Sequence, residues 1–540
     1  MTCFKSLLVN YFQSIRDIIS LLSGRQLCLI AGGFLFLLIN SIYWYAFSHR
    51  LILALFSALL LVLFTFFVSA TIGRNDDQVK EAKLFLASLT ILGILFSGVF
   101  TPLSAPDEDF HFTASYALSN FIMGKGYQSD DPLLMRQSDA EFYNEFVHNL
   151  DLSSANYSYL NREYSQLLDS SYSEIQTITG RSHSVSNNLP QEKLLSALGI
   201  TLARLLNLGP AYLYLFGRLF NLAFYITCVY IAFRITPIGR NIIAVISLFP
   251  MCLHLAASYS YDSFIIPMSI LLTALCLRSI KAEGLFTLRE GSQILFVAML
   301  LAPCKVIYTL VALLALFIPQ ERFRSRKEEL FIKLGCMMLV GMVLAGGRLL
   351  DYCANSTSVT SAANNQLDFR GDQSGHFYTV SDVVQNPLKF VKMLYLSLDH
   401  FGFEYLQRMV GGSLGWFQEE IVSPYIYVVA LTVVMGMSVI SSDDDGDVLS
   451  FSASLAGIAV FVIGLVLVML TLLVSWVFNT EGLITGVQGR YFLPYLPWLL
   501  ISIRTSRFKF DGNLFPYLLM AMLFLNFYNL TRIFSIALTL

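Results

Sequence analysis

Residues 452–477 read SASLAGIAVFVIGLVLVMLTLLVSWV and contain no charged side chain. A helix needs about 20 apolar residues to cross a bilayer, so this stretch is long enough to span one. The rest of the chain has a similar character: of 540 residues, 56% are hydrophobic and 13% are charged, whereas soluble domains are about 25% charged. The sequence therefore predicts an all-α polytopic membrane protein and excludes an ordinary cytosolic enzyme. Its net charge of -2 provides no basic surface for nucleic acid, so we expect no nucleic-acid partner.

Apolar runs of this kind recur along the whole chain, and no internal repeat is visible. They predict a bundle of about 13 transmembrane helices, although the seventh and eighth runs are short and tightly joined. The predicted spans are 27–47, 51–72, 84–103, 211–233, 241–258, 262–280, 291–304, 306–319, 331–349, 424–440, 452–477, 491–503 and 514–535.

The distribution of Lys and Arg predicts the orientation of these spans, because short basic loops stay on the cytoplasmic side. A cytoplasmic N-terminus places the basic connections on the inner face of the membrane, and an odd number of spans leaves the C-terminus outside. The basic connections lie at 74–83, 234–240, 278–289, 322–327 and 504–509.

Two long polar segments, 104–210 and 350–423, then fall on the extracytoplasmic side. Loops of this length are usually functional or disordered. We divide the chain into an N-terminal cytoplasmic segment with two extra transmembrane helices (1–83), a transmembrane core (84–505) and a C-terminal transmembrane helix (506–540).

The sharpest local motif is PDEDFHF at residues 106–112, immediately outside the third span. A carboxylate of Asp107 or Glu108 next to the lipid headgroups can take the proton of an acceptor hydroxyl. Asp107, Glu108 and His111 together also offer ligands for a divalent metal such as Mg or Mn. The alternative is an acidic helix N-terminus that complements the helix dipole. Residues 109–124 have amphipathic spacing, which predicts a helix along the membrane surface.

A second motif, GVQGRYFLP at residues 486–494, opens the twelfth predicted span on the same outer side. The planar guanidinium of Arg490 is suited to phosphate oxygens, and the flanking glycines allow the backbone to approach a ligand closely. Gln488 and Tyr491 lie beside it in the chain. The alternative is an interfacial arginine that reaches the headgroups beside an aromatic belt.

Three further residues fall on the outer side. Asp262 begins the sixth span, where it either caps the helix or joins a site. Lys305, in the turn between two short spans, either binds phosphate or reaches the headgroups. Trp416 follows the glycine-rich turn GGSLG and either stacks on a sugar or anchors at the interface.

Five motifs together carry a resemblance to a bacterial membrane family, the domain of unknown function 2142 family, which is grouped with the GT-C glycosyltransferases. They are PDEDFHF at 106–112, FPMCLHLAASYSYDS at 249–263, APCKVIY at 302–308, GGSLGWF at 411–417 and GVQGRYFLPYLP at 486–497.

Proteins of the GT-C superfamily transfer a sugar from a polyprenyl-phosphate carrier on the non-cytoplasmic side. The resemblance implies a GT-C-like bundle in a bacterial cytoplasmic (inner) membrane. It implies Asp107 as the candidate for the catalytic base, with Glu108 as a close second, and Arg490 with Lys305 on the donor phosphate. It implies that Gln488 and Tyr491 line the same pocket. The additional acid of this chain, Asp109, leaves open which carboxylate acts.

The orientation from Lys and Arg places all five motifs on one side of the membrane, so His111, Asp262 and Trp416 can join the same substrate pocket. We therefore hypothesise an inverting, membrane-embedded glycosyltransferase. It would use a polyprenyl-phosphate-linked sugar and a cell-envelope glycan or lipid acceptor, with the lipid bilayer as its surroundings. The alternatives are a transporter or flippase of lipid-linked glycans, a glycan polymerase, and a scaffold without enzymatic activity.

Overall fold

The protein is mostly helical in the computed structural model, which describes residues 78–125, 133–169, 174–177, 191–355, 377–416, 418–442 and 448–540, besides isolated positions between 31 and 60. Two small sheets of two strands each accompany the helices, and the sequence did not predict them. The predicted spans 27–47 and 51–72 lie outside the described residues.

Five helices of the described part are long and apolar enough to cross a membrane. Each coincides with a span that the sequence predicts, because a long apolar run with few charged residues can satisfy its backbone hydrogen bonds within a membrane only as a helix. The membrane character of the chain is therefore confirmed. These helices are α4 (Gln78–Val99), α9 (Pro210–Ile235), α12 (Asp262–Lys281), α19 (Phe451–Trp476) and α21 (Phe515–Ala537).

The count of 13 spans is not confirmed, since several predicted spans are short or broken. The segment 241–258 forms two short helices, because Pro250 has no N–H to continue the first one. The segment 306–319 is a 3-10 helix, and 491–503 is a turn followed by a short helix. The corresponding elements are α10 (Arg240–Ser247), α11 (Pro250–Ala256), η1 (Val306–Phe317), η4 (Gly489–Phe492) and α20 (Leu496–Ser502).

The remaining predicted spans form helices of unequal length. Helix α14 runs well beyond the predicted 331–349, whereas α13 and α18 are shorter than a full span. These helices are α13 (Leu288–Leu301), α14 (Arg326–Asn355) and α18 (Tyr425–Met437), with two 3-10 turns, η2 (Gln320–Arg322) and η3 (Glu419–Ile421), between elements.

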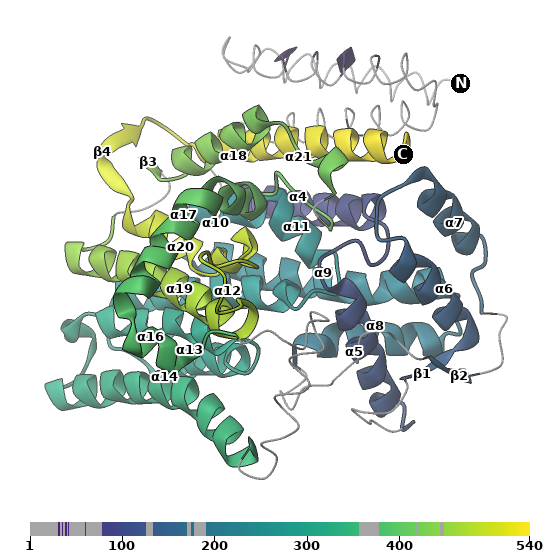
Figure 1. Ribbon diagram of the computed structural model, residues 1–540. Helices are drawn as coiled ribbons and strands as arrows, with labels where there is room; N and C mark the ends of the chain where they lie inside the picture. Colours follow the sequence, from purple (N-terminus) through teal and green to yellow (C-terminus); the bar gives the residue numbers. More distant parts are fainter. Residues whose placement is uncertain are drawn as a thin grey trace.

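The first long polar segment forms a helical cluster at one end of the bundle (Figure 1). We expected its helix α5 (Glu108–Ile122) to lie along the membrane surface. Instead, residues on nearly all sides of this helix are buried. It packs against α8, which also packs on α9. The other elements of this cluster are β1 (Leu133–Arg136), α6 (Gln137–His148), α7 (Ser154–Tyr164), β2 (Glu174–Thr177) and α8 (Gln191–Leu205), with β1 and β2 antiparallel.

The second polar segment is helical in its described part, where α16 (Val380–Gln385) leads into α17 (Pro387–Val410). Helix α17 packs against η4 and α18. Strands β3 (Ile440–Ser442) and β4 (Thr505–Phe510) form a parallel pair that joins the connection after α18 to the one after α20.

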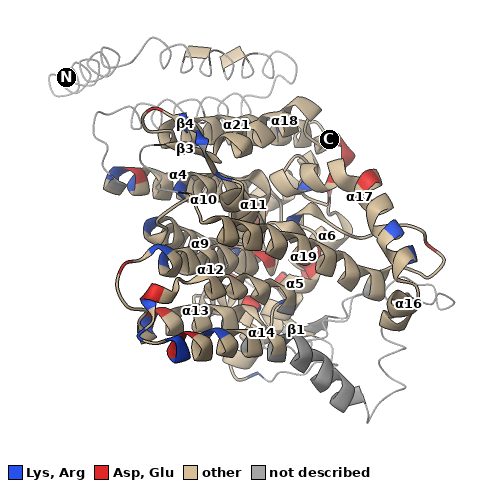
Figure 2. Ribbon diagram, turned by 90° about the vertical axis from the view of Figure 1, so that its left-hand side faces the viewer, with Lys and Arg blue, Asp and Glu red and all other residues tan. Residues whose placement is uncertain are grey.

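Figure 2 shows Lys and Arg gathered along one edge of the bundle, beside α4, α9, α12 and α13. This edge corresponds to the beginning of α4 and the ends of α9 and α12. The turn after α4 and the beginning of α12 therefore lie at the opposite end, which carries the motif residues.

Candidate functional site

The acidic motif lies in a turn between α4 and α5 that has an unusual backbone. Leu103 (φ 60) and Asp107 (φ 59) both adopt the left-handed conformation, which is uncommon for a residue other than glycine and an outlier for a bulky one. Such strain persists only where surrounding contacts hold it in place. Here the Leu103 N–H donates to the Tyr214 hydroxyl (2.9 Å), and the Leu103 carbonyl accepts from Trp416 Nε1 (2.9 Å).

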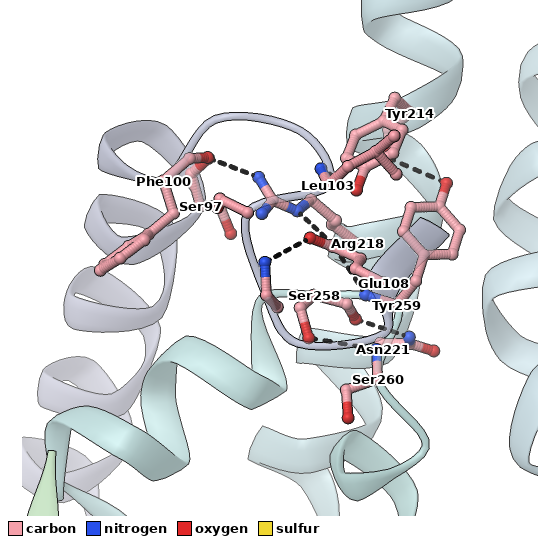
Figure 3. A network of polar contacts seen from close by, with 12 residues as sticks. Ser97, Phe100, Leu103, Glu108, Tyr214, Arg218, Asn221, Ser258, Tyr259 and Ser260 are labelled. Atoms are coloured by element: carbon pink, nitrogen blue, oxygen red, sulfur yellow. Dashed lines mark hydrogen bonds and ion pairs between the residues drawn. The ribbon is translucent and has the colours of Figure 1, made fainter. Parts of the chain in front are cut away.

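Glu108 stabilises this turn from the inside (Figure 3). Its buried carboxylate accepts hydrogen bonds from the Ala105 N–H (3.1 Å) and the Tyr259 N–H (3.0 Å), and it pairs with Arg218 Nε at 3.3 Å. Arg218 also donates to the Phe100 carbonyl at 2.7 Å. Glu108 was the second candidate for the base after Asp107, but its contacts give it an architectural role.

Asp107 is oriented toward a different partner and is 45% exposed. Its Oδ2 lies 3.6 Å from Nη2 of Arg490, whose Nη1 lies 3.3 Å from Oδ2 of Asp262. Both Arg490 and Asp262 are only 1% exposed. Asp262 lies in the first turn of α12 but does not cap it, because Tyr261 is at the cap position without a side-chain cap bond. The structure therefore brings together three motif residues from distant parts of the sequence.

The guanidinium of Arg490 has no hydrogen bond on any of its three nitrogens within the described part of the chain, although the group is buried. Its two carboxylate neighbours are at ion-pair distance only. Buried polar atoms without partners are rare in proteins and require an explanation. An incoming anion with several oxygens would supply the missing acceptors.

A lysine and two tyrosines complete this side of the site. Lys305 donates to the hydroxyl of Tyr261 at 2.6 Å and lies over the rings of Tyr261 (4.5 Å) and Tyr491 (4.2 Å). Arg490 lies 5.3 Å from the centre of the Tyr491 ring. Both cations thus lie against the ring of Tyr491, and Lys305 and Arg490 can contact one ligand.

His111 of α5 belongs to the same cluster through Tyr261, whose ring centre is 4.9 Å away. Its Nδ1 lies 2.6 Å from Nζ of Lys193, a buried residue of α8. Burial and the nearby cations, first among them Lys193, lower the pKa of His111 well below 6.5, so the imidazole is neutral near pH 7. Burial lowers the pKa of Lys193 from 10.5 to about 8, which leaves its ammonium charged at neutral pH.

The remaining predicted residues have supporting positions. Gln488 is half-buried directly before η4, and its Oε1 has no hydrogen bond to any described group. Gly489 brings η4 against the backbone of α17 at Tyr405, and not against a ligand as we expected from the sequence. Trp416 is half-buried, and its Nε1 donates a hydrogen bond to the Leu103 carbonyl in the acidic turn. Stacking of a sugar on the Trp416 ring stays a prediction.

The predicted metal set of Asp107, Glu108 and His111 is not assembled as a cluster. Within the described ranges there is no group of three or more His, Cys, Asp or Glu that could hold a metal ion. Glu108 is directed to Arg218, and His111 uses its Nδ1 for Lys193. These side chains therefore do not fit a three-ligand site for Mg or Mn.

Lys193 and Tyr261 also belong to this site, and neither was predicted from the sequence. A signal for Lys193 is present in the sequence, because polar residues recur at helical spacing along α8, as expected for a helix that faces a polar partner. These residues, all buried, are Lys193, Ser196, Thr201 and Arg204. Tyr261 lies between Ser260 and Asp262 in the chain, and no sequence pattern distinguishes it from the other tyrosines.

The fold and this ionic site define a helical membrane protein with buried charges at one end of its bundle. A family model described as predicted membrane protein (DUF2142) matches residues 89–499, and the chain belongs to this family. The family resemblance seen in the sequence is thereby confirmed, whereas the relation to GT-C enzymes stays a prediction. No curated protein and no solved structure matches the chain.

Proposed function

We propose that the protein is a membrane-embedded, inverting glycosyltransferase that moves a sugar from a polyprenyl-phosphate carrier to a cell-envelope glycan or lipid. The observation that carries this proposal is the buried guanidinium of Arg490, which lacks hydrogen bonds and lies between Asp262 and the half-exposed Asp107. A phosphate ligand and a reachable carboxylate are the two groups that such a transfer requires.

Arg490 and Lys305 would bind the donor phosphate, which carries the charge that develops when the bond to the sugar breaks. Preorganised cations in a water-poor site stabilise such charge strongly. Asp262 would fix the orientation of Arg490 through their buried contact of 3.3 Å. The aromatic rings of Tyr261 and Tyr491 would hold the ammonium of Lys305 between them.

Asp107 would act as the base, because it is the acid of the pair Asp107 and Glu108 that an acceptor can reach from solvent. As the acceptor oxygen forms its bond to the anomeric carbon, its proton would pass to Asp107. The electron pair of the broken bond would stay on the phosphate oxygen. Attack from the face opposite the phosphate inverts the configuration of the anomeric carbon.

We propose an extracytoplasmic location for this site in a bacterial cytoplasmic membrane, within a GT-C-like bundle whose shorter helices complete the membrane domain. The support is the distribution of charges: Lys and Arg gather along the edge beside α4, α9, α12 and α13 (Figure 2), where α4 begins and α9 and α12 end, whereas the turn of Asp107 follows the other end of α4. Basic residues favour the cytoplasmic side. The ionic site would then face a lipid-linked donor in the outer leaflet.

The surface glycans of cells lacking this protein provide the test, with complementation by wild type, Asp107→Asn or Asp151→Asn at equal membrane abundance. Asp151 is an exposed acid of the outer helical cluster and serves as the matched control. We expect wild type and Asp151→Asn to restore a missing sugar and Asp107→Asn to fail. Full restoration by Asp107→Asn would refute a carboxylate base and favour a flippase or scaffold.

A further inference from the structure

Lys193 is a buried cation that the proposed reaction does not yet use. Its only polar contact among the described residues is Nδ1 of His111 at 2.6 Å, and its ammonium also lies 5.6 Å from the centre of the Tyr261 ring. Burying an ammonium group without a carboxylate partner is costly. The cost of burying a third positive charge in the cluster of Arg490 and Lys305 indicates that this charge has a function, such as binding an anion.

His111 gives this cation a direction. Because the Lys193 ammonium donates to Nδ1, the neutral imidazole must carry its own hydrogen on Nε2. Nε2 is buried and has no hydrogen-bond partner within the described residues. Lys193 therefore fixes the tautomer of His111 and leaves a buried N–H donor available beside Tyr261, whose hydroxyl accepts from Lys305.

The charges of the site show when this donor is needed. Arg490 and Lys305 are balanced by Asp107 and Asp262, so these four groups are neutral together. The donor phosphodiester has one negative charge, whereas the departing phosphomonoester has two. Transfer of the acceptor proton neutralises Asp107 and leaves the four groups with one net positive charge. Lys193 supplies the second positive charge that matches the departing dianion.

We propose that Lys193 and His111 form a second phosphate-binding arm, which holds the departing polyprenyl phosphomonoester in preference to the phosphodiester of the donor. This inference rests on the proposed function and names the form of the ligand that the site binds best. The arm would donate the Nε2–H of His111 to a phosphate oxygen while Lys193 contributes its charge. The site would consequently bind product more tightly than substrate.

The test is equilibrium binding of two ligands to the full chain in lipid nanodiscs: the monoester farnesyl phosphate and the diester farnesyl methyl phosphate. We expect wild type to prefer the monoester by about tenfold or more, the usual effect of an additional charged hydrogen bond. Lys193→Met should abolish this preference, and His111→Gln should reduce it. Lys333→Met is the matched control, because Lys333 pairs with Glu329 outside the site.

The pH dependence provides a second readout, because a phosphomonoester has a second pKa of about 6 and is a dianion above pH 7. The preference of wild type should fall as the pH rises through about 8, where Lys193 loses its charge, and Lys193→Met should lack this fall. The groups that act on Lys193 are Glu192 on its own helix, His111 and Asp107 around the start of α5, Tyr261 and Asp262 at the start of α12, and Cys304 after α13. Lys305 lies on the ring of Tyr261.

An unchanged monoester preference in both Lys193→Met and His111→Gln would overturn the inference. If wild type transfers sugar but binds both esters equally, the second arm is wrong and the proposed function stands. If wild type binds neither ester and transfers no sugar, the phosphate site itself fails, and the inference fails with it.

Discussion

The two neighbouring acids Asp107 and Glu108 are expected to respond in opposite ways to loss of their charge. Glu108→Gln leaves Arg218 buried without its carboxylate and places an amide against the N–H groups of Ala105 and Tyr259. Removing one partner of a buried ion pair costs about 3–5 kcal/mol. Because Arg218 keeps backbone carbonyls as partners, we expect the lower end, about 3 kcal/mol of unfolding free energy.

Asp107→Asn should have little effect on stability, because Asp107 is 45% exposed and its contact with Arg490 is long at 3.6 Å. Ion pairs of this kind contribute about 1 kcal/mol or less. The same substitution should abolish sugar transfer, since an amide cannot accept the proton of the acceptor. Glu108→Gln, by contrast, should reduce the amount of folded protein, and the molecules that do fold should retain activity.

The assay is thermal unfolding of the purified variants in one detergent, followed by intrinsic fluorescence, together with sugar transfer per folded molecule. A clearly lower melting temperature for Glu108→Gln and a near wild-type value for Asp107→Asn would support the assignment. The reverse order, or loss of activity in fully folded Glu108→Gln, would refute the division of roles between the two acids.

Gly489→Ala should prevent η4 from packing on α17, because the added methyl group would overlap the carbonyl of Tyr405; Gly482→Ala, with open space around it, is the control for membrane abundance and donor binding. Arg490→Lys should weaken binding of farnesyl phosphate about tenfold, since an ammonium cannot replace the planar fork, and wild-type affinity would contradict this role. Lys193→Met should stabilise the protein at pH 7 by up to about 3 kcal/mol, because burial lowers the pKa of Lys193 from 10.5 to about 8. Between pH 8 and 10 the unfolded chain binds more protons than the folded protein, so the stability of the wild type rises with pH in this range. Melting curves should therefore show that the stability difference between Lys193→Met and wild type shrinks from pH 8 to pH 10. A difference that stays constant would contradict the lowered pKa of Lys193.

The long apolar helices could be predicted because their sequences permit little else. Helix α19 lacks ionisable residues throughout, and α4, α9, α12 and α21 contain few of them within stretches of high hydropathy. The shorter elements could not be separated from these by hydropathy alone. Pro250 indicates the break between α10 and α11. Because the chain is apolar on both sides of this proline, however, the hydropathy of the segment still predicted one continuous span.

The gathering of the motif residues could be anticipated from the alternation of basic loops, which places the ends of helices on one side. The different contacts of Asp107 and Glu108 could not be anticipated from the sequence, because they depend on the left-handed backbone conformation of Asp107. That conformation directs the two neighbouring side chains to Arg490 and Arg218. Lys193 escaped attention because its significance comes from His111, which is distant in the sequence.

The contacts around the acidic turn also determine the order in which the site can form during synthesis. Leu103 and its neighbours are held by Tyr214, Arg218 and Trp416, which leave the ribosome long after the turn itself. At about 5–20 residues per second, Arg490 emerges about 20 to 80 seconds after Asp107. A nascent chain therefore inserts most of its helices before it can bring the carboxylate and the guanidinium together. Translation products that end before Arg490 would therefore occupy the membrane without the cation to which we assign phosphate binding, and we expect them to lack the proposed activity.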